Sequence, residues 1–252
     1  MSESPISLPE GYALCFHETL DSTNSEALRQ AGEGASSGLW VWACSQTGGR
    51  GRLGRRWESL PGNLLASLLL LSKSAPGQIA QLGFVAGLAL HDAVLGLSGN
   101  ALHSLTLKWP NDLLLDGMKT GGILLECNAQ KNGRQAVAIG IGLNLAAHPD
   151  IAERPTTHLA AHDIKATPEA ALEQLASAFD SWLGVWASGA GFPEIASAWS
   201  ERALTKNSPI RVKLADELLE GSYLGIDATG ALMLELPDGS KRCITTGDVF
   251  PL

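Results

Sequence analysis

Apolar residues along this chain recur in short runs separated by glycine, proline and polar residues. Runs of this length, bounded by turn signals, are typical of strands. They lie at residues 39–44, 63–71, 104–109, 113–115, 122–127 and 136–145. Asn132-Gly133, between the last two runs, is a strong hairpin signal. The pattern therefore predicts an antiparallel sheet.

Other segments have helical features. Residues 79–97 are rich in alanine and leucine, which favours a buried helix. Thr167-Pro168 places an N-cap before a proline at the first helical position and predicts a helix through about residue 183. A further helix is expected over 195–203. Residues 146–166 suggest no function.

A short first helix is expected near the amino terminus. Thr23 and Glu26 have the spacing of a capping box, in which Thr23 would be the N-cap. Gly32 is well placed to end this helix.

After residue 206 the pattern changes to short strand-like runs separated by turn signals such as Asp238-Gly239. These runs lie at residues 210–214, 218–226, 231–236 and 242–246. We expect a small carboxy-terminal β barrel, and hence two domains, 1–204 and 205–252.

Composition and terminal sequence disfavour a nucleic-acid-binding protein and a membrane protein. The chain has 252 residues, 45% of them hydrophobic, which is enough for a substantial core. A net charge of −8 disfavours wholesale nucleic-acid binding, which needs many cations. The amino terminus lacks the features of a signal peptide, and the longest apolar run, 64–71, is too short to span a bilayer. We expect a soluble, cytoplasmic protein without a membrane partner.

The cysteines do not indicate a metal or disulfide framework. Cys15, Cys44, Cys127 and Cys243 lie far apart and include no CxxC pair. We expect reduced structural thiols.

Four of the 18 Lys and Arg side chains of this acidic chain lie within residues 50–56. In Gly49–Trp57 they alternate with glycines and end at an indole. Glycine permits close approach to a ligand, and guanidinium groups bind phosphate or carboxylate bidentately. The segment predicts a loop that closes over an anion, with Trp57 as a stacking surface; a solvated surface loop is the alternative.

Lys108-Trp109-Pro110-Asn111-Asp112 lies at the end of one predicted strand and the start of the next. Pro110 cannot donate to a sheet and biases Trp109 towards an extended backbone, so a rigid corner is expected. Such a corner can fix a cation, an amide and a carboxylate relative to one another, which suits phosphate or metal handling. An ordinary Asn-Asp turn with an exposed lysine is the alternative.

Two glycine pairs mark further candidate positions. Lys119 precedes Gly121-Gly122 at the start of a predicted strand, where glycine often marks close approach of a ligand. Gly140, Gly142 and Asn144 alternate along another strand and fall on one face, which leaves a trough for a flat ligand. A surface lysine and a packing feature are the respective alternatives. Neither a dinucleotide fingerprint nor a P-loop is present in the sequence.

Together and in this order, the motifs resemble those of the biotin protein ligases, which form biotinyl-5′-AMP and pass biotin to a carrier-protein lysine. The matching segments are Ser22-Thr23-Asn24, Gln46 with Gly49–Trp57, Lys108–Asp112, Lys119–Glu126 and Gly140–Asn144. The resemblance covers most of the first 145 residues and, more loosely, the carboxy-terminal β segment.

The resemblance implies an α+β fold. The expected catalytic domain is like that of class II aminoacyl-tRNA synthetases, with a mixed, largely antiparallel sheet and flanking helices, followed by a small SH3-like barrel. The chain begins almost at this domain, as in short members without an amino-terminal DNA-binding domain, so a repressor role is not expected. The implied substrates are ATP with Mg²⁺ and biotin. The implied partner is a biotin carboxyl carrier protein, a subunit of acetyl-CoA carboxylase, with other biotin-dependent carboxylases as candidates. We expect a monomer or a homodimer.

The resemblance also assigns roles to residues of this sequence. Catalysis would fall to Arg52, Lys119 and Lys108. Biotin would be bound by Ser22, Thr23, Asn24, Gln46, Gly49, Arg50, Arg52, Lys119, Gly122, Gly140 and Gly142. ATP or the adenylate would be bound by Arg52, Arg55, Trp57, Lys108, Asn111 and Asn144.

Some of these roles are more specific. Arg50 and Arg52 would face the junction between biotin and phosphate, Arg55 the outer phosphates, and Arg56 solvent. Asp112 is the candidate partner of the metal. Since Thr23 is also the predicted helix cap, Ser22 would serve the ligand while Thr23 caps the helix.

Three rival functions stay open. A lipoate ligase or octanoyltransferase would share the fold, but the transferase needs a cysteine nucleophile, and Cys127 has no evident activating partner in the sequence. A non-catalytic biotin sensor would not need Arg52, Lys108 and Lys119. A nucleic-acid-binding module is disfavoured by the acidic balance.

Overall fold

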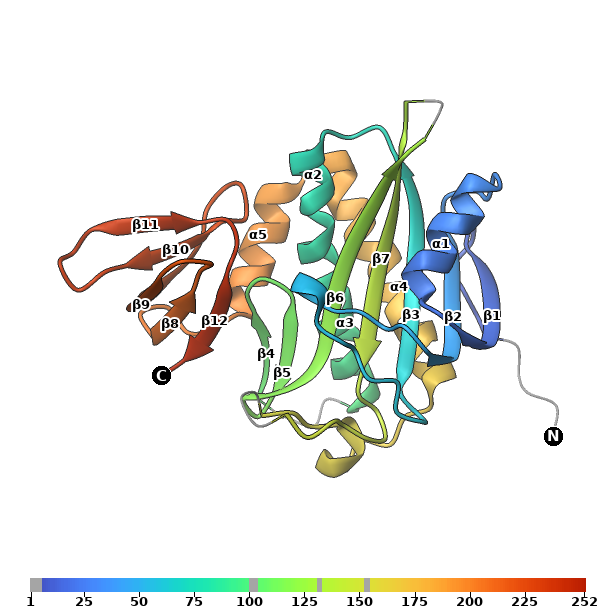
Figure 1. Cartoon of the computed structure of the whole chain (residues 1–252), viewed down its shortest axis with the longest axis horizontal. Helices are drawn as coiled ribbons and strands as arrows, with labels where there is room; N and C mark the ends of the chain where they lie inside the picture. Colours follow the sequence, from blue (N-terminus) through green and yellow to red (C-terminus); the bar gives the residue numbers. More distant parts are fainter. Residues whose placement is uncertain (1–5, 100–103, 131–132, 152–154) are drawn as a thin grey trace.

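The computed structural model describes residues 6–99, 104–130, 133–151 and 155–252, and contains two sheets (Figure 1). The larger sheet has seven strands in the order β1-β2-β3-β7-β6-β5-β4. Its strands are β1 (Ala13–Leu20), β2 (Leu39–Gln46), β3 (Leu64–Ser72), β4 (Leu105–Lys108), β5 (Asp112–Leu115), β6 (Met118–Ala129) and β7 (Gln135–Leu143). Six of these were predicted from apolar runs. The turn residue Asn132 lies outside the described residues.

The sheet is mixed, because β1 pairs with β2 in parallel while the other neighbours are antiparallel. A parallel pair needs a crossover connection, which helix α1 (Thr23–Gly32) supplies. The sequence did not predict β1, an edge strand in which every residue is at least partly exposed and whose apolar run stops after Phe16. The predicted mixed, largely antiparallel sheet is confirmed.

One face of the large sheet is covered by helices α3 (Leu82–Leu97), α4 (Pro168–Trp186) and α5 (Phe192–Glu201) (Figure 1). The main core lies between them and the sheet. The helix predicted over 79–97 begins earlier and is divided into α2 (Pro76–Ala80) and α3. This stretch, Pro76–Leu97, is long and apolar enough to cross a membrane, but 67% of its most apolar part is buried. It is therefore the core helix of the domain.

Helix α1 covers only part of the opposite face, over a small cluster that includes Ala27, Val41, Leu69 and Ala138. The rest of this face is open to the connection between β2 and β3, which carries the short 3-10 helix η1 (Arg52–Gly54). The other 3-10 helices are η2 (Leu159–His162) and η3 (Ala187–Gly189).

The predicted cap of α1 is wrong by one residue. Ser22 is the N-cap, and its hydroxyl accepts from the backbone N–H of Ser25 at 3.5 Å. Thr23 is therefore already inside the first turn, and its hydroxyl is available for other contacts. The predicted end at Gly32 is confirmed, and so is Thr167 as the N-cap of α4.

The smaller sheet has five antiparallel strands in the order β11-β10-β9-β8-β12, consistent with the predicted SH3-like barrel. They are β8 (Pro209–Lys213), β9 (Leu218–Ile226), β10 (Leu232–Glu235), β11 (Lys241–Ile244) and β12 (Asp248–Pro251). The sequence did not predict β12. Trp109 ties the two sheets together, because its buried Nε1 donates to the carbonyl of Gly230 at 3.0 Å. All four cysteines are free thiols.

Candidate functional site

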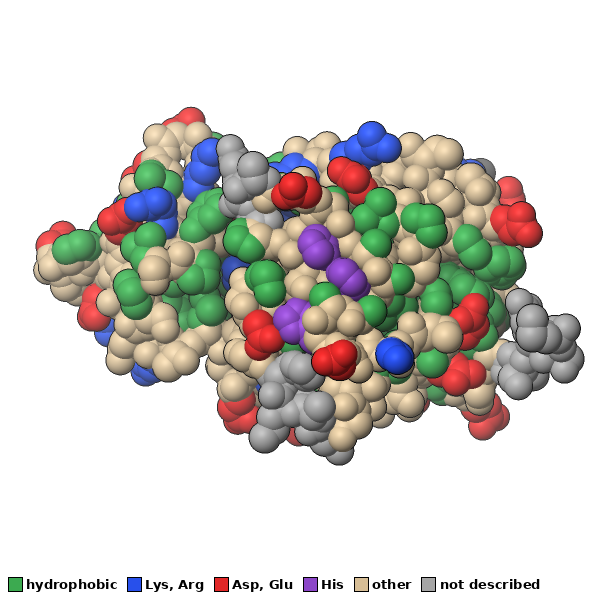
Figure 2. Space-filling view, turned by 90° about the horizontal axis from the view of Figure 1, so that it is seen from below, with side chains coloured by type: hydrophobic (Ala, Val, Ile, Leu, Met, Phe, Trp, Pro, Cys, Tyr) green, Lys and Arg blue, Asp and Glu red, His purple; other side chains and the backbone are tan. Residues whose placement is uncertain are grey.

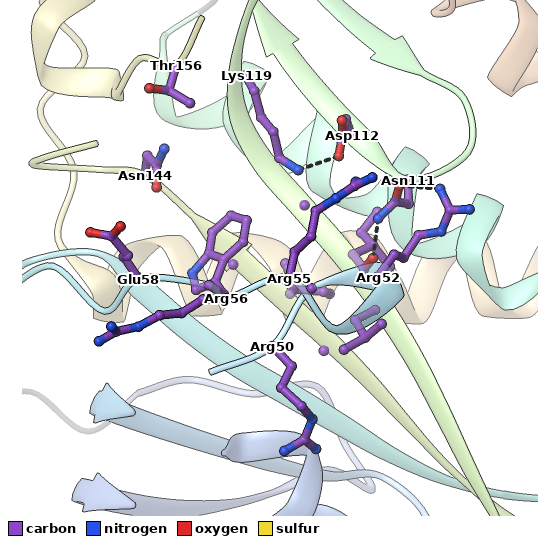
Figure 3. Close-up of a pocket in the computed structure, with 18 of the residues that line it drawn as sticks. Arg50, Arg52, Arg55, Arg56, Glu58, Asn111, Asp112, Lys119, Asn144 and Thr156 are labelled. Carbon is purple, nitrogen blue, oxygen red and sulfur yellow. Dashed lines mark hydrogen bonds and ion pairs between the residues drawn. The ribbon is translucent and has the colours of Figure 1, made fainter. Parts of the chain in front are cut away.

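A cavity of about 550 Å³ lies on the open face of the large sheet, beneath the β2–β3 connection (Figure 3). It brings together most of the residues that the sequence singled out. Those lining it are Ser22, Thr23, Asn24, Gln46, Arg50, Arg52, Arg55, Arg56, Trp57, Lys108, Asn111, Asp112, Lys119, Gly122, Gly140, Gly142 and Asn144. Gly49 lies beside the cavity, within the loop that covers it.

The floor of the cavity is one row of residues across five strands. Leu65 on β3 pairs with Gly142 on β7, which pairs with Gly122 on β6. Gly122 pairs with Asp112 on β5, and Asp112 with Lys108 on β4. Side chains paired in this way lie on the same face of a sheet. The pleat therefore places a carboxylate and a lysine at one end of a glycine floor.

Asp112 organises the cationic end of the cavity. Its carboxylate forms an ion pair with Lys119 and lies 3.0 Å from Lys108 Nζ. Burial raises the pKa of this carboxyl, but the positive charges of Lys119 and Lys108 outweigh burial and lower it to about 2. The three side chains thus form a buried charged group that carries a net positive charge.

Asn111 extends this end towards the arginine loop. Its Nδ2 donates to the carbonyl of Ile123 at 2.7 Å, which fixes the amide. Arg52 Nη1 lies 3.4 Å from Asn111 Oδ1 and donates to the carbonyl of Gly247 at 3.3 Å. The rigid corner predicted from the sequence therefore holds Lys108, Asn111 and Asp112 together. The Trp109–Pro110 peptide bond is cis.

The carboxy-terminal sheet supplies one wall of the cavity. Arg55 forms an ion pair with Asp248, and Lys108 Nζ donates to the carbonyl of Val249 at 3.3 Å. With the bond from Arg52 to Gly247, three cations of the site contact one short segment, 247–249. The sequence suggested no contact for the carboxy-terminal barrel.

The arginine loop is held at both ends of its turn. The Trp57 N–H donates to the carbonyl of Gly49 at 3.0 Å, and the Gly51 N–H donates to the carbonyl of Arg55 at 2.7 Å. Leu53 at its tip has φ of 57° and is 74% exposed. A leucine in this left-handed conformation is uncommon and marks a constrained turn.

Trp57 lies directly on the glycine floor. A Cβ added to Gly142 would come within 2.4 Å of the indole, and one added to Gly122 within 3.0 Å. Lys119 Nζ lies 5.5 Å from the centre of the indole ring, which is within range of a cation–π contact. The glycines therefore leave space for a flat group, and in this structure that group is the Trp57 indole, whereas the sequence suggested a ligand.

The opposite end of the cavity is polar and uncharged. The Thr23 N–H donates to Gln46 Oε1 at 2.8 Å. Ser67 Oγ lies 2.7 Å from Thr23 Oγ1 and 2.6 Å from Asn24 Oδ1. A Cβ on Gly140 would come within 2.5 Å of Asn24 Oδ1, so this glycine admits the amide.

Arg50 does not reach the cationic end of the cavity. Arg50 Nη2 donates to Ser25 Oγ at 3.0 Å and pairs with Glu126 at 3.2 Å. In Figure 3 its side chain points away from Lys119 and Asp112. The expectation that Arg50 faces the same junction as Arg52 therefore disagrees with this geometry, because Glu126 holds Arg50 beside α1.

Asn144 and the segment after it close another side of the cavity. Asn144 Nδ2 donates to the carbonyl of Thr157 at 3.0 Å.

Histidines gather on the face of the molecule seen in Figure 2, and the rings of His148 and His158 lie 4.9 Å apart. Burial and the neighbouring His148 and His162 lower the pKa of His158.

Sequence reasoning missed Ser67, Glu126 and the segment 247–249. Ser67 is fully buried within the apolar run of β3. A single hydroxyl inside such a run must find a hydrogen-bond partner, and this could have marked Ser67 as a candidate site residue. Glu126 closes the Lys119–Glu126 motif but was given no role.

The surroundings of Asp112 do not fit a metal ligand. Its oxygens contact the ammonium groups of Lys108 and Lys119, which would repel a cation. Among the residues that the structure describes, no group of three or more His, Cys, Asp or Glu side chains could hold a metal ion. The prediction that Asp112 serves the metal is therefore not supported by the geometry.

Comparison with known proteins agrees with this site. Residues 16–144 match the model of the biotin/lipoate A/B protein ligase family, and residues 205–250 match the biotin protein ligase C terminal domain. The chain is 42% identical to a biotin--[acetyl-CoA-carboxylase] ligase of Paracoccus denitrificans, over 91% of this chain and 97% of that protein. It is 32% identical to the bifunctional ligase/repressor BirA of Bacillus subtilis, over 92% of this chain and 72% of that protein.

Solved structures agree on the fold. The biotin protein ligase of Aquifex aeolicus, in complex with biotin and ATP, superposes with a TM-score of 0.80 at 24% identity, over 95% of this chain and 99% of that chain.

The fold and the two-ended cavity define the class as the biotin and lipoate protein ligases. Within this class the chain belongs to the biotin protein ligase family, whose members are ATP-dependent, amide-forming ligases.

Proposed function

We propose that the cavity binds biotin and ATP side by side, forms biotinyl-5′-AMP and passes the biotinyl group to a specific lysine of a biotin carboxyl carrier protein. The main support for this proposal is that a single cavity has two different ends. Its uncharged polar end contains Thr23 and Gln46, its cationic end contains Lys108 and Lys119, and glycines form the floor between them. A ligand with a neutral polar head and a carboxylate tail would place that carboxylate beside the phosphates.

In the first step the biotin carboxylate attacks the α-phosphorus of ATP, and pyrophosphate leaves. Both reactants are anions, so the transition state needs positive groups already in place. We assign this role to Lys119, Lys108 and Arg52. Removing one well-aimed donor of this kind costs about 3 kcal/mol, or roughly a hundredfold in rate.

Asp112 has a positioning role in this proposal. A lone carboxylate would repel the phosphates, but Asp112 is enclosed by two ammonium groups. It holds the two lysines at a fixed separation while the trio keeps a net positive charge. Magnesium then belongs to the substrate, as MgATP, and needs no resident ligand from the protein.

The adenine would lie against the face of Trp57 that is turned away from the glycine floor, beside Asn144. Arg55 would meet the outer phosphates when it leaves Asp248, since its ion pair is on the cavity wall. Asn111, already bonded to Ile123, would orient Arg52 towards the phosphates.

The neutral end would bind the bicyclic head of biotin. Thr23, Gln46 and Asn24 supply hydrogen-bonding groups there, and Gly140 keeps the approach clear. Ser22 contributes through the helix cap, while Gly49 and Arg50 shape the rim of the loop.

In the second step the amine of the carrier lysine attacks the acyl carbon of the mixed anhydride, and AMP leaves. Water would hydrolyse this anhydride, so a loop that covers it protects the intermediate. The Gly49–Trp57 loop lies where such a cover is needed (Figure 3).

The division into domains 1–204 and 205–252 is part of the proposal. It is supported by the two sheets having no strand in common and by the family match that begins at residue 205. We further propose a cytoplasmic monomer or homodimer, which can also serve other biotin-dependent carboxylases.

Acyl transfer through a cysteine is not favoured. Cys127 does not line the cavity, and burial together with the nearby Glu126 raises its pKa. A thiol so placed is a poor nucleophile at neutral pH. The cationic trio also has no evident purpose in a sensor that performs no chemistry.

Incubation with MgATP, radiolabelled biotin and a biotin carboxyl carrier domain tests the proposal. Pyrophosphate release that depends on biotin, and label on a lysine of the carrier, are expected. Release of pyrophosphate with lipoate but not with biotin would contradict it.

A further inference from the structure

Glu126 does not line the cavity but is bonded to two residues that do, Asn24 at its uncharged end and Arg50 at the rim of the loop. Its side chain, on β6, is 31% exposed and pairs with Arg50. Asn24 Nδ2 donates to Glu126 Oε2 at 2.8 Å and to the carbonyl of Leu124 at 3.2 Å. Both partners of this amide nitrogen accept hydrogen bonds.

This contact fixes which way the Asn24 amide faces. An amide has one donor end and one acceptor end, and their assignment follows from the partners. Since a carboxylate paired with Arg50 and a backbone carbonyl can only accept, Nδ2 must face them. Oδ1 is therefore turned towards Ser67 and Gly140.

The orientation of Asn24 propagates through two hydroxyls, each with a single proton. Asn24 Oδ1 can only accept, so the 2.6 Å contact requires Ser67 to donate its proton there. The 2.7 Å contact between Ser67 and Thr23 then requires the proton of Thr23. Thr23 then has no hydroxyl proton left for Gln46 Oε1, which lies farther away, 3.2 Å from Thr23 Oγ1.

The result is a one-way chain of hydrogen bonds from Thr23 through Ser67 and Asn24 to Glu126. Its consequence at the cavity is that Thr23 Oγ1 offers only lone pairs to a ligand. Gln46 has the opposite polarity, because its Oε1 accepts the Thr23 N–H and its Nε2 is the donor left for other contacts. An acceptor beside a donor complements a cyclic urea, whose N–H groups flank a carbonyl.

We propose that Glu126 is a positioning residue that fixes the polarity of this chain and thereby selects ligands that donate an N–H to Thr23. The inference rests on the proposed function, in which the neutral end binds the biotin head. It adds a determinant of specificity that does not touch the ligand.

The test compares biotin with its two cyclic carbamate analogues, in which one or the other ring N–H is replaced by oxygen. Biotin-dependent pyrophosphate release gives kcat/KM for each. In the wild type, at least one analogue should be disfavoured by about tenfold or more, because its ring oxygen meets the lone pairs of Thr23.

Glu126→Gln preserves shape but can donate to Asn24 Oδ1, so the chain can reverse when Asn24 turns its amide and gives up the longer, 3.2 Å bond to the Leu124 carbonyl. We expect the preference for biotin over that analogue to fall to about threefold or less, with KM for ATP changed less than about twofold. Ser67→Ala, which interrupts the chain, should reduce the preference in the same way. Glu220→Gln is the matched control, because it removes one side of an exposed ion pair with Arg211, 2.6 Å apart, in the other sheet.

The outcomes separate the inference from the proposed function. An unchanged preference in Glu126→Gln, or in Ser67→Ala should the first variant not fold, overturns the inference. Equal losses of kcat/KM for biotin and for the analogue would also overturn the inference, because a merely structural role of Glu126 would affect both ligands. A wild type that releases no pyrophosphate with biotin would instead refute the proposed function.

Discussion

Lys108 and Asp112 face each other directly across β4 and β5, with Nζ and Oδ2 3.0 Å apart. Three residues lie between them in the sequence, and the cis peptide bond before Pro110 is among these. The same carboxylate also holds Lys119 from β6. The positive end of the cavity is thus built by three neighbouring strands around one buried acid.

Replacing this acid should damage both stability and catalysis. In Asp112→Asn the two lysines lose their counter-charge, and removing one partner of a buried ion pair costs about 3 kcal/mol. We expect urea unfolding to show a loss of this order, and pyrophosphate release to fall at least about tenfold as the lysines separate. Asp163→Asn is the control, since Asp163 has φ of 61°, which asparagine tolerates. Equal activity in the two variants would contradict the role of Asp112.

The low pKa of Asp112 gives a pH dependence of defined sign. Its pKa is about 2 in the folded protein against an ordinary value of 3.8, so the unfolded state takes up the proton first as pH falls. The stability that Asp112 contributes is complete above about pH 4 and is lost between 4 and 2. The difference in Tm between the wild type and Asp112→Asn should therefore shrink as pH is lowered through this range.

A methyl group on the glycine floor should impair ligand binding. In Gly142→Ala the new Cβ would lie 2.4 Å from the Trp57 indole and force it off the floor. We expect KM for ATP to rise about tenfold, equivalent to about 1.4 kcal/mol, with a shift in tryptophan fluorescence. Gly77→Ala, in α2, has no atom within 4 Å of the added Cβ and should leave KM unchanged.

Arg52→Ala should loosen the cover over the intermediate. Without the contacts to Asn111 and Gly247, the loop loses one of its links to the cavity wall, and only the Arg55–Asp248 ion pair among those described holds it there. We expect biotinyl-AMP to dissociate faster and to label lysines of unrelated proteins. Retention of the intermediate at the wild-type rate, measured by filter binding, would refute this prediction.

The link between the two sheets should contribute measurably to stability. Trp109→Phe removes the donor to the Gly230 carbonyl and leaves that buried acceptor without this partner. The expected loss is about 1–3 kcal/mol in denaturant unfolding. Trp182→Phe is the comparison, because its Nε1 bonds to the half-exposed Asp92 within the first domain and its loss should cost less. An equal or smaller loss in Trp109→Phe would count against the link.

The sequence predicted the elements whose residues are buried. Apolar runs identified β2 to β7, and Thr167-Pro168 identified the start of α4. It did not predict β1, whose residues are all at least partly exposed, or β12, a strand of four residues that begins with an aspartate and ends with a proline. The cap of α1 was misplaced because Ser22 and Thr23 are adjacent and chemically alike.

The site was predicted where a motif is contiguous and missed where it depends on tertiary contacts. Lys108–Asp112 and Gly140–Asn144 line the cavity as expected. The partners of Arg55 and Arg50 are Asp248 and Glu126, far away in sequence, and no local pattern indicates them. Charge and the family resemblance suggested that Arg50, Arg52 and Arg55 face an anionic ligand, whereas Arg50 and Arg55 pair with carboxylates of the protein.

The row from Leu65 to Lys108 also bears on how the chain must fold. Each of its five members comes from a different strand, and side chains alternate between faces, so a slip of β5 by one residue would turn Asp112 into the core and Leu113 into the cavity. The pairing of β3 with β7 joins segments far apart in sequence and forms slowly compared with the local pairings among β4, β5, β6 and β7. Adenylation activity during refolding should therefore report the moment at which all five strands have found their partners.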